Sequence, residues 1–189
     1  MGFCLNKLNE DRDKAFKIAV DKGFYEQPIN KESELMMIIS ELAEAINALR
    51  CKRHTDLYGW TTPDFYYNEA YTDLFEKCCK DTFEDELADT LLRALSLAGA
   101  LKINLRLAEV IVHERLSISA PTQPASVFFF ALTQLLAQGI AVFDTPVVLN
   151  RFIGYLIVWC REEGIEIDLH VYLKMIYNEH RPFLNGKSF

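Results

Sequence analysis

The chain has 189 residues, 50% of them hydrophobic and 25% charged, so it can bury one large or two small hydrophobic cores. Its net charge of −7 and pI near 5.1 argue against a binder of nucleic-acid polymers or of anionic membranes, since such surfaces need a basic stripe. The five cysteines lack the paired spacing of zinc or redox sites, and polar residues interrupt the most apolar segments. We therefore expect a soluble protein of the reducing cytoplasm, without a membrane span.

Apolar residues recur at spacings of three and four along almost the whole chain, while the alternation typical of strands is nearly absent. This pattern predicts an all-α fold. Asn30 is the predicted N-cap of the second helix, and Asp81 or Thr82 that of the fourth, as in a capping box. The helices are expected, in chain order, at 9–22, 31–53, 68–79, 82–101, 105–116, 124–142, 146–163 and 169–179.

The clearest break in this pattern lies at 119–124, where two prolines in four residues would interrupt a helix. The segments on its two sides, approximately 31–118 and 124–189, share a weak but ordered similarity, with an insertion around 51–80 in the first copy. We therefore expect the single domain 1–189 to be a helical bundle of two degenerate helical-hairpin repeats with pseudo-twofold symmetry. Such a fused pair would be either self-sufficient as a monomer or paired again as a homodimer.

Two short acidic motifs stand out: Glu41 and Glu44 in one expected helix, and Glu86 and Asp89 in another. A spacing of three residues puts each pair on one helix face, with neighbouring side chains ~6 Å apart. Both pairs lie in otherwise apolar stretches, where carboxylates without a counter-charge would be costly to bury. Oxygen ligands suit Mg²⁺, with Mn²⁺ as an alternative, so the four acids are predicted to bind such a cation.

The two copies differ in their chemistry. In the second copy the positions of the four acids are occupied by Leu135, Gln138, Asn150 and Ile153. In the last helix the difference is reversed, because Lys174, Asn178 and Arg181 stand where the first copy has Val110, Glu114 and Ser117. Lysine and arginine neutralise phosphate charge. The pattern predicts one site, with acids from the first copy and phosphate ligands from the second.

Three segments, 34–50, 83–93 and 174–187, resemble the MazG-type all-α nucleoside triphosphate pyrophosphohydrolases, which include the dimeric dUTPases and dCTP pyrophosphatases. The first two match the family's Glu-x-x-Glu and Glu-x-x-Asp motifs, and the third its Lys-x-x-x-Asn-x-x-Arg helix end. The resemblance implies that the four acids bind Mg²⁺. It further implies hydrolysis of the α–β anhydride of an NTP or dNTP to the monophosphate and pyrophosphate, as in sanitation of the nucleotide pool.

By the same resemblance, Lys174, Asn178 and Arg181 contact phosphate or sugar, and either Glu41 or Glu44 orients the attacking water. The acidic pairs are further apart than in most members, and extra residues precede the last helix. The segment 58–67 is rich in aromatic residues that either stack on a base or cap the bundle.

Other interpretations of these residues stay open. The acids could be solvated helix faces or form an ion-pair network with Arg50, Lys80 or Arg93. The chain could then be a non-catalytic helical module that binds a nucleotide or a metal, or a structural interaction bundle.

Overall fold

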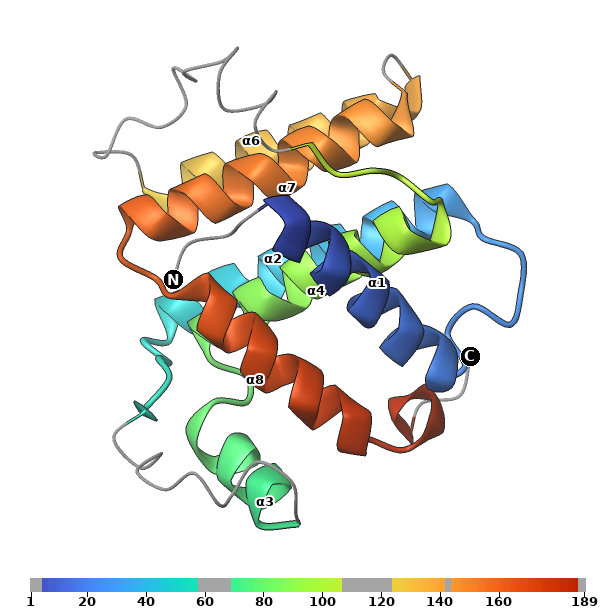
Figure 1. Ribbon diagram of the computed structural model, residues 1–189. Helices are drawn as coiled ribbons and strands as arrows, with labels where there is room; N and C mark the ends of the chain where they lie inside the picture. The colour runs from blue at the N-terminus through green and yellow to red at the C-terminus, as the bar shows by residue number, and fades with distance from the viewer. Residues whose placement is uncertain (1–4, 58–68, 107–123, 142–143, 187–189) are drawn as a thin grey trace.

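The computed structural model describes residues 5–57, 69–106, 124–141 and 144–186, and these segments are helical, with no strand among them (Figure 1). The predicted all-α class is confirmed for this part of the chain. The elements are α1 (Leu5–Asp21), α2 (Lys31–Arg50), α3 (Glu69–Cys78), α4 (Phe83–Ala100), α6 (Ala125–Ala141), α7 (Thr145–Glu162), α8 (Ile167–His180) and the 3₁₀ helix η3 (Phe183–Gly186). Three predicted features lie wholly or mostly outside the described residues: the aromatic segment 58–67, the helix 105–116 and the break at 119–124.

Side-chain caps begin two of the helices where the sequence predicts them. The side chain of Asn30 accepts a hydrogen bond from the Ser33 N–H at 2.9 Å, and Thr82 accepts one from the Asp85 N–H at 3.4 Å. Both residues have extended backbone conformations, as N-caps do, and each satisfies a free N–H group of the first helical turn. These caps place the first turns of α2 and α4.

The end of α2 differs from the prediction, because the helix stops at Arg50 and not at residue 53. Lys52 adopts a left-handed conformation with φ 54°, and the Arg53 N–H donates to the Ala48 carbonyl at 3.0 Å. This six-to-one hydrogen bond closes a Schellman turn, which usually contains glycine at the left-handed position. A lysine there gives no sequence signal for a helix end.

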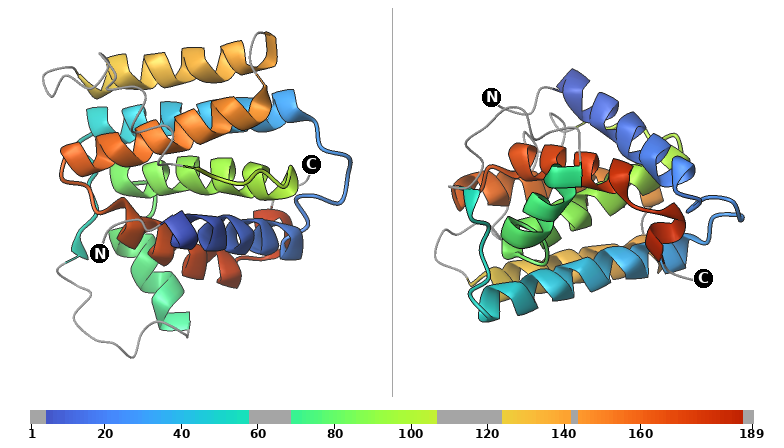
Figure 2. Two further views of the ribbon diagram at one scale, coloured as in Figure 1. Left: turned by 45° about the horizontal axis from the view of Figure 1, so that its top comes forward. Right: turned by 90° about the horizontal axis from the view of Figure 1, so that it is seen from below.

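Helix α4 is the central element of the described fold (Figures 1 and 2). It packs against α1, α2, α7 and α8, while α6 packs on α2 and α7. Fourteen of its 18 residues are buried, and Leu87, Leu91 and Leu95 are fully inaccessible. Its few polar side chains are therefore held in place by core packing on the other faces of the helix. None of the helices in the described segments is long and apolar enough to cross a bilayer.

The crossing of α1 over α4 depends on a glycine. A Cβ atom at Gly99 would lie 2.6 Å from the Cβ of Phe16, so no larger residue fits without a shift of α1. Asn9 fixes the same crossing, since its side chain accepts from the Leu105 N–H at 3.0 Å and donates to the Leu105 carbonyl at 3.1 Å. The two helices are thereby locked beside the chain that leaves α4.

The chain after α8 returns to the end of α1. The Leu184 N–H donates to the Lys22 carbonyl at 2.8 Å, and Lys22 Nζ donates to the Glu179 carbonyl at 2.9 Å. Gly23, with φ 85°, lies under the ring of Phe183, and a Cβ there would come within 2.2 Å of that ring. This contact closes the fold on the side where α1 and α8 end.

Helices α4 and α7 both have 18 residues and both end in the same turn, with φ 55° at Lys102 and φ 74° at Gly164. When α4 and α7 are aligned by these turns, Glu86 corresponds to Val148, whereas the sequence comparison pairs it with Asn150. The register therefore differs by two residues. In either register α7 has no carboxylate before its last residue.

Candidate functional site

A cavity of about 400 Å³ opens between α1, α2, α4 and α8. Polar groups from α2 and α4 face it on one side and the end of α8 on another. All seven residues predicted from sequence to form the site line this cavity: Glu41, Glu44, Glu86, Asp89, Lys174, Asn178 and Arg181. The structure thus brings together the acids and the cations that the sequence analysis assigned to one site.

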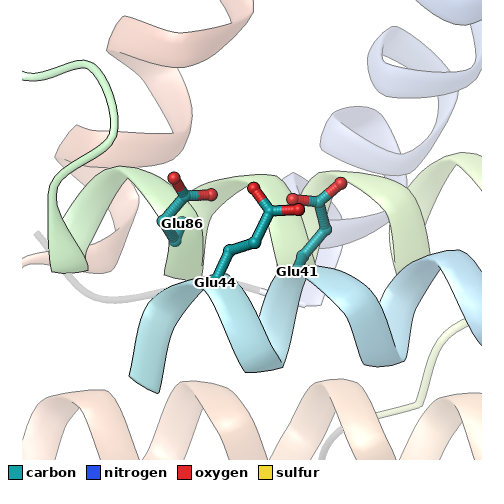
Figure 3. A group of neighbouring side chains, drawn as sticks. All are labelled: Glu41, Glu44 and Glu86. Carbon is teal, nitrogen blue, oxygen red and sulfur yellow. The ribbon is translucent and has the colours of Figure 1, made fainter. Parts of the chain in front are cut away.

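Three of the acids form a compact group (Figure 3). Glu41 and Glu44 project from one face of α2, Glu86 projects from the adjacent α4, and carboxylate oxygens of the three lie within 4.8 Å of one another. The spacing of three residues in α2 and the packing of α2 on α4 produce this convergence. Such a group offers several oxygen ligands to one hard cation.

Glu41 differs from the other two acids because it has an ion pair. Arg93, which extends from α4, donates from Nε to Glu41 Oε1, so one of the ion pairs anticipated for these acids is present. Burial, together with the negative charge of Asp89, nevertheless raises the pKa of Glu41. Arg93 therefore only partly offsets the charge of the cluster.

Glu86 carries the least compensated charge of the three. Burial raises its pKa to about 8, and the negative charges of Asp89 and Asp85 add to this effect. Neither Glu44 nor Glu86 has a side-chain hydrogen bond or ion pair within the described segments. A cation at the cluster would stabilise the ionised form of both.

Asp89 lies outside the compact group and is bound by Lys174. Lys174 Nζ lies 2.8 Å from Asp89 Oδ2 and 2.8 Å from Asp85 Oδ2, and the lysine is 3% exposed. Burial opposes the charge on Lys174, but the two carboxylates outweigh it and raise its pKa. The lysine predicted to contact phosphate is thus already bound to two acids of α4.

The sequence analysis missed Asp85, whose carboxylate is buried beside Lys174. Burial raises the pKa of Asp85 to about 7, against the opposing effect of the Lys174 ammonium. Asp85 lies four residues before Asp89, so helical spacing places the two on one face. The sequence therefore contained this spacing, but the pair Glu86 and Asp89 was assigned to the site in its place.

The end of α8 forms the opposite wall of the cavity. Asn178 and Arg181 line it, and the Arg181 guanidinium lies 5.7 Å from the centre of the Tyr177 ring. The side-chain oxygen of Asn178 is buried and has no hydrogen-bond partner in the described structure. This wall therefore combines a half-buried cation with an unsatisfied hydrogen-bond acceptor.

A third part of the lining is apolar and aromatic, and it was not predicted. Phe24, Tyr25 and Leu92 contribute to it, and the Tyr25 hydroxyl bonds to Ser96 Oγ at 3.1 Å. Burial raises the pKa of Tyr25 to about 12, so the phenol stays neutral. Glu34 is half-buried and lines the same cavity.

Glu84 lies next to these acids in α4 but has the opposite electrostatic character. His54 Nδ1 lies 2.7 Å from Glu84 Oε1, and the Thr55 N–H donates to Glu84 Oε2 at 2.9 Å. Burial works against its charge, but these two hydrogen bonds outweigh burial and lower the pKa of Glu84. Glu84 lines a different cavity, of about 480 Å³, together with the buried His170.

Comparison of the chain with family models, with curated proteins and with solved structures finds no match. The cavity, its charges and the motifs in the sequence are therefore the observations from which a function can be argued.

Proposed function

We propose that the protein is a Mg²⁺-dependent nucleoside triphosphate pyrophosphohydrolase of the MazG type, which cleaves the α–β phosphoanhydride of an NTP or dNTP. The products would be the monophosphate and pyrophosphate. The sequence resemblance and one structural observation support this proposal. The observation is a cavity with a carboxylate cluster on one wall and a half-buried arginine on another.

The charges in the cavity favour a divalent cation. The compact group together with Asp85 and Asp89 makes five neighbouring carboxylates, and the basic side chains that pair with them in the described segments are Lys174 and Arg93. If all were ionised, the local charge would be about −3, which is costly at low effective dielectric. Oxygen ligands of this kind suit Mg²⁺, and Mn²⁺ would bind the same set.

The roles of the acids follow from their partners. When bound, Mg²⁺ would stabilise phosphate charge and lower the pKa of a water molecule. Glu41 is oriented by Arg93, whereas Glu44 is exposed and has no partner in the described segments, so Glu44 is the better acceptor for a proton from that water. Glu86 supplies a ligand from the second helix.

The other walls fit the remaining parts of such a substrate. Arg181, with its planar fork of donors, would bind phosphate oxygens. Asn178 would accept a hydrogen bond from a sugar hydroxyl at its unsatisfied side-chain oxygen, or donate to phosphate from its amide nitrogen. The apolar wall around Phe24 and Leu92 would hold the base. A role in sanitation of the nucleotide pool of the cytoplasm would follow from this chemistry.

The internal repeat belongs to the same proposal. The equal lengths and similar final turns of α4 and α7 support it, with an acidic pair in α4 and none in α7. One site built by both halves could then work in a monomer, although pairing to a homodimer is equally compatible with this architecture.

A second candidate is a non-catalytic helical module that binds a metal or nucleotide. The ion pairs of Glu41 with Arg93 and of Asp89 with Lys174 favour it, because they already neutralise part of the acidic charge. Such a module would bind Mn²⁺ or a nucleotide without turnover, whereas a purely structural bundle would bind neither.

A panel of NTPs and dNTPs with Mg²⁺ tests the proposal, with pyrophosphate and phosphate measured separately. We expect pyrophosphate release with at least one nucleotide and a loss of about 100-fold or more in kcat for Glu44→Gln. Glu32→Gln is the matched control, since Glu32 is exposed in the first turn of the same helix. Equal activity of the Glu44→Gln and Glu32→Gln variants would refute the assigned role of Glu44, and phosphate release alone would refute the reaction.

A further inference from the structure

Lys174 is enclosed more tightly than a phosphate-binding lysine needs to be. It lies midway along α8, is 3% exposed, and forms ion pairs of 2.8 Å with both Asp85 and Asp89. The rings of Phe75 and Tyr177 lie 5.4 and 5.6 Å from its ammonium. Moving its ammonium to an anion in the cavity would break the ion pair with the buried Asp85 as well as the one with Asp89, which is costly.

Asp85 is placed to act on Lys174 and not on a ligand. It does not line the cavity, it is 3% exposed, and its Oδ2 accepts from Lys174 Nζ and from the Asp81 N–H at 3.1 Å. Its Oδ1 is buried without a hydrogen-bond partner in the described structure. A buried carboxylate with one unsatisfied oxygen lowers the stability of the fold. A role in holding Lys174 would explain why it is present.

Asp89, in contrast, faces the cavity. Its side chain is 24% exposed, it lines the cavity beside Glu41 and Glu86, and its ion pair with Lys174 is through Oδ2. Oδ1 therefore remains available to a cation. The rotation of this carboxylate is fixed by the ammonium behind it.

We propose that Asp85 and Lys174 are positioning residues, which hold Asp89 at the edge of the Glu41–Glu44–Glu86 cluster so that it completes the cation site. This inference rests on the proposed function, because it assumes that the cluster binds a divalent cation. It also makes α8 part of the metal site, since the helix that carries Asn178 and Arg181 is anchored to the acids through Lys174.

Whether the cation affinity rises or falls in Lys174→Met distinguishes a positioning role of Lys174 from the effect of its charge alone. Loss of Lys174 removes a positive charge next to the cluster, so electrostatics alone predicts tighter Mn²⁺ binding in Lys174→Met. Loss of positioning predicts weaker binding, by about 10- to 100-fold, as is usual for groups that orient metal ligands. Mn²⁺ affinity is measured from the EPR signal of the free ion, which needs no turnover.

Asp85→Asn and the double variant Lys174→Met with Asp85→Asn complete the test. We expect the Mn²⁺ affinity of each variant to be at least about 10-fold lower than that of the wild type. The affinity of the double variant should be no lower than that of the single variant that binds Mn²⁺ less tightly, because both residues act through Asp89. The double variant leaves no unpaired charge at the buried Asp85 position, and only the partly exposed Asp89 loses its partner, so the measurement stays available if Lys174→Met does not fold.

Lys80→Met is the matched control, because Lys80 lines the same cavity but is exposed, and its ion pair among the described residues is with Glu76, at 4.0 Å. Its loss should leave Mn²⁺ binding unchanged or tighten it slightly. Unchanged or tighter binding in Lys174→Met, or in the double variant, would overturn the positioning role while the cation site stands. Absence of Mn²⁺ binding by the unmodified protein would overturn the cation site and this inference together.

Discussion

Substitution of Glu86 by glutamine should stabilise the cation-free protein, although the residue is buried. Its carboxylate lies within 4.8 Å of those of Glu41 and Glu44, and each such pair of ionised groups repels by about 3 kcal/mol at an effective dielectric of 20. Glutamine has nearly the same shape but no charge. The variant therefore removes repulsion and leaves no cavity behind.

The size of the effect depends on pH in a defined direction. The pKa of Glu86 is raised from 4.5 to about 8 in the folded protein, so its contribution to stability is present below pH 4.5 and is lost as the pH rises towards 8. Relative to Glu86→Gln, the wild-type free energy of unfolding should fall by up to ~1.4 kcal/mol per pH unit in this window. From pH 6 to pH 8 the two proteins should diverge by about 2 to 3 kcal/mol.

Urea denaturation in EDTA, followed by circular dichroism at several pH values, measures this difference. Glu84→Gln is the control in the same helix, because hydrogen bonds from His54 and Thr55 lower the pKa of Glu84. It should destabilise the protein above pH 4.5, and the loss should shrink as the pH falls. If Glu86→Gln is less stable than wild type at pH 8, or if their difference does not change with pH, the uncompensated acidic cluster is refuted.

Three further results are expected. Mg²⁺ at 100 times its dissociation constant should stabilise the wild type by about 2.7 kcal/mol. In differential scanning fluorimetry this should raise its Tm by about 5 to 10 °C, with no rise in Glu86→Gln. An equal rise in both proteins would argue against the site. Gly99→Ala should cost about 1 to 3 kcal/mol in urea denaturation, because its Cβ would meet Phe16 at 2.6 Å; unchanged stability would show that α1 can shift freely. Burial lowers the pKa of His170 below 6.5, so the protein should lose stability, relative to His170→Gln, as the pH falls below 6.5; parallel pH profiles of the two proteins would contradict this.

The sequence predicted the described helices well because each has a sustained apolar face and two carry side-chain caps. The early end of α2 could not be predicted, since Lys52 takes a left-handed conformation that normally belongs to glycine. At the end of α7 the same turn contains Gly164, which gives the expected signal.

For the site, helical spacing, the repeat comparison and the family resemblance were enough to predict seven of the residues that line one cavity. Which cation binds which acid could not be predicted, because it depends on how helices pack. Arg93 lies four residues after Asp89 in α4, yet it bonds to Glu41 in α2, while Asp89 is bound by Lys174 from the far end of the chain. Local spacing would have paired Arg93 with Asp89.

The central position of α4 has a consequence for motion. Since α4 is packed on α1, α2, α7 and α8, its amide groups can exchange with solvent only when most of the fold opens. Hydrogen exchange should therefore be slowest in the helix that carries Asp85, Glu86 and Asp89, whereas binding sites usually lie in regions that open easily. A cation arriving at these carboxylates would find them already ordered and would spend little of its binding free energy on arranging the chain.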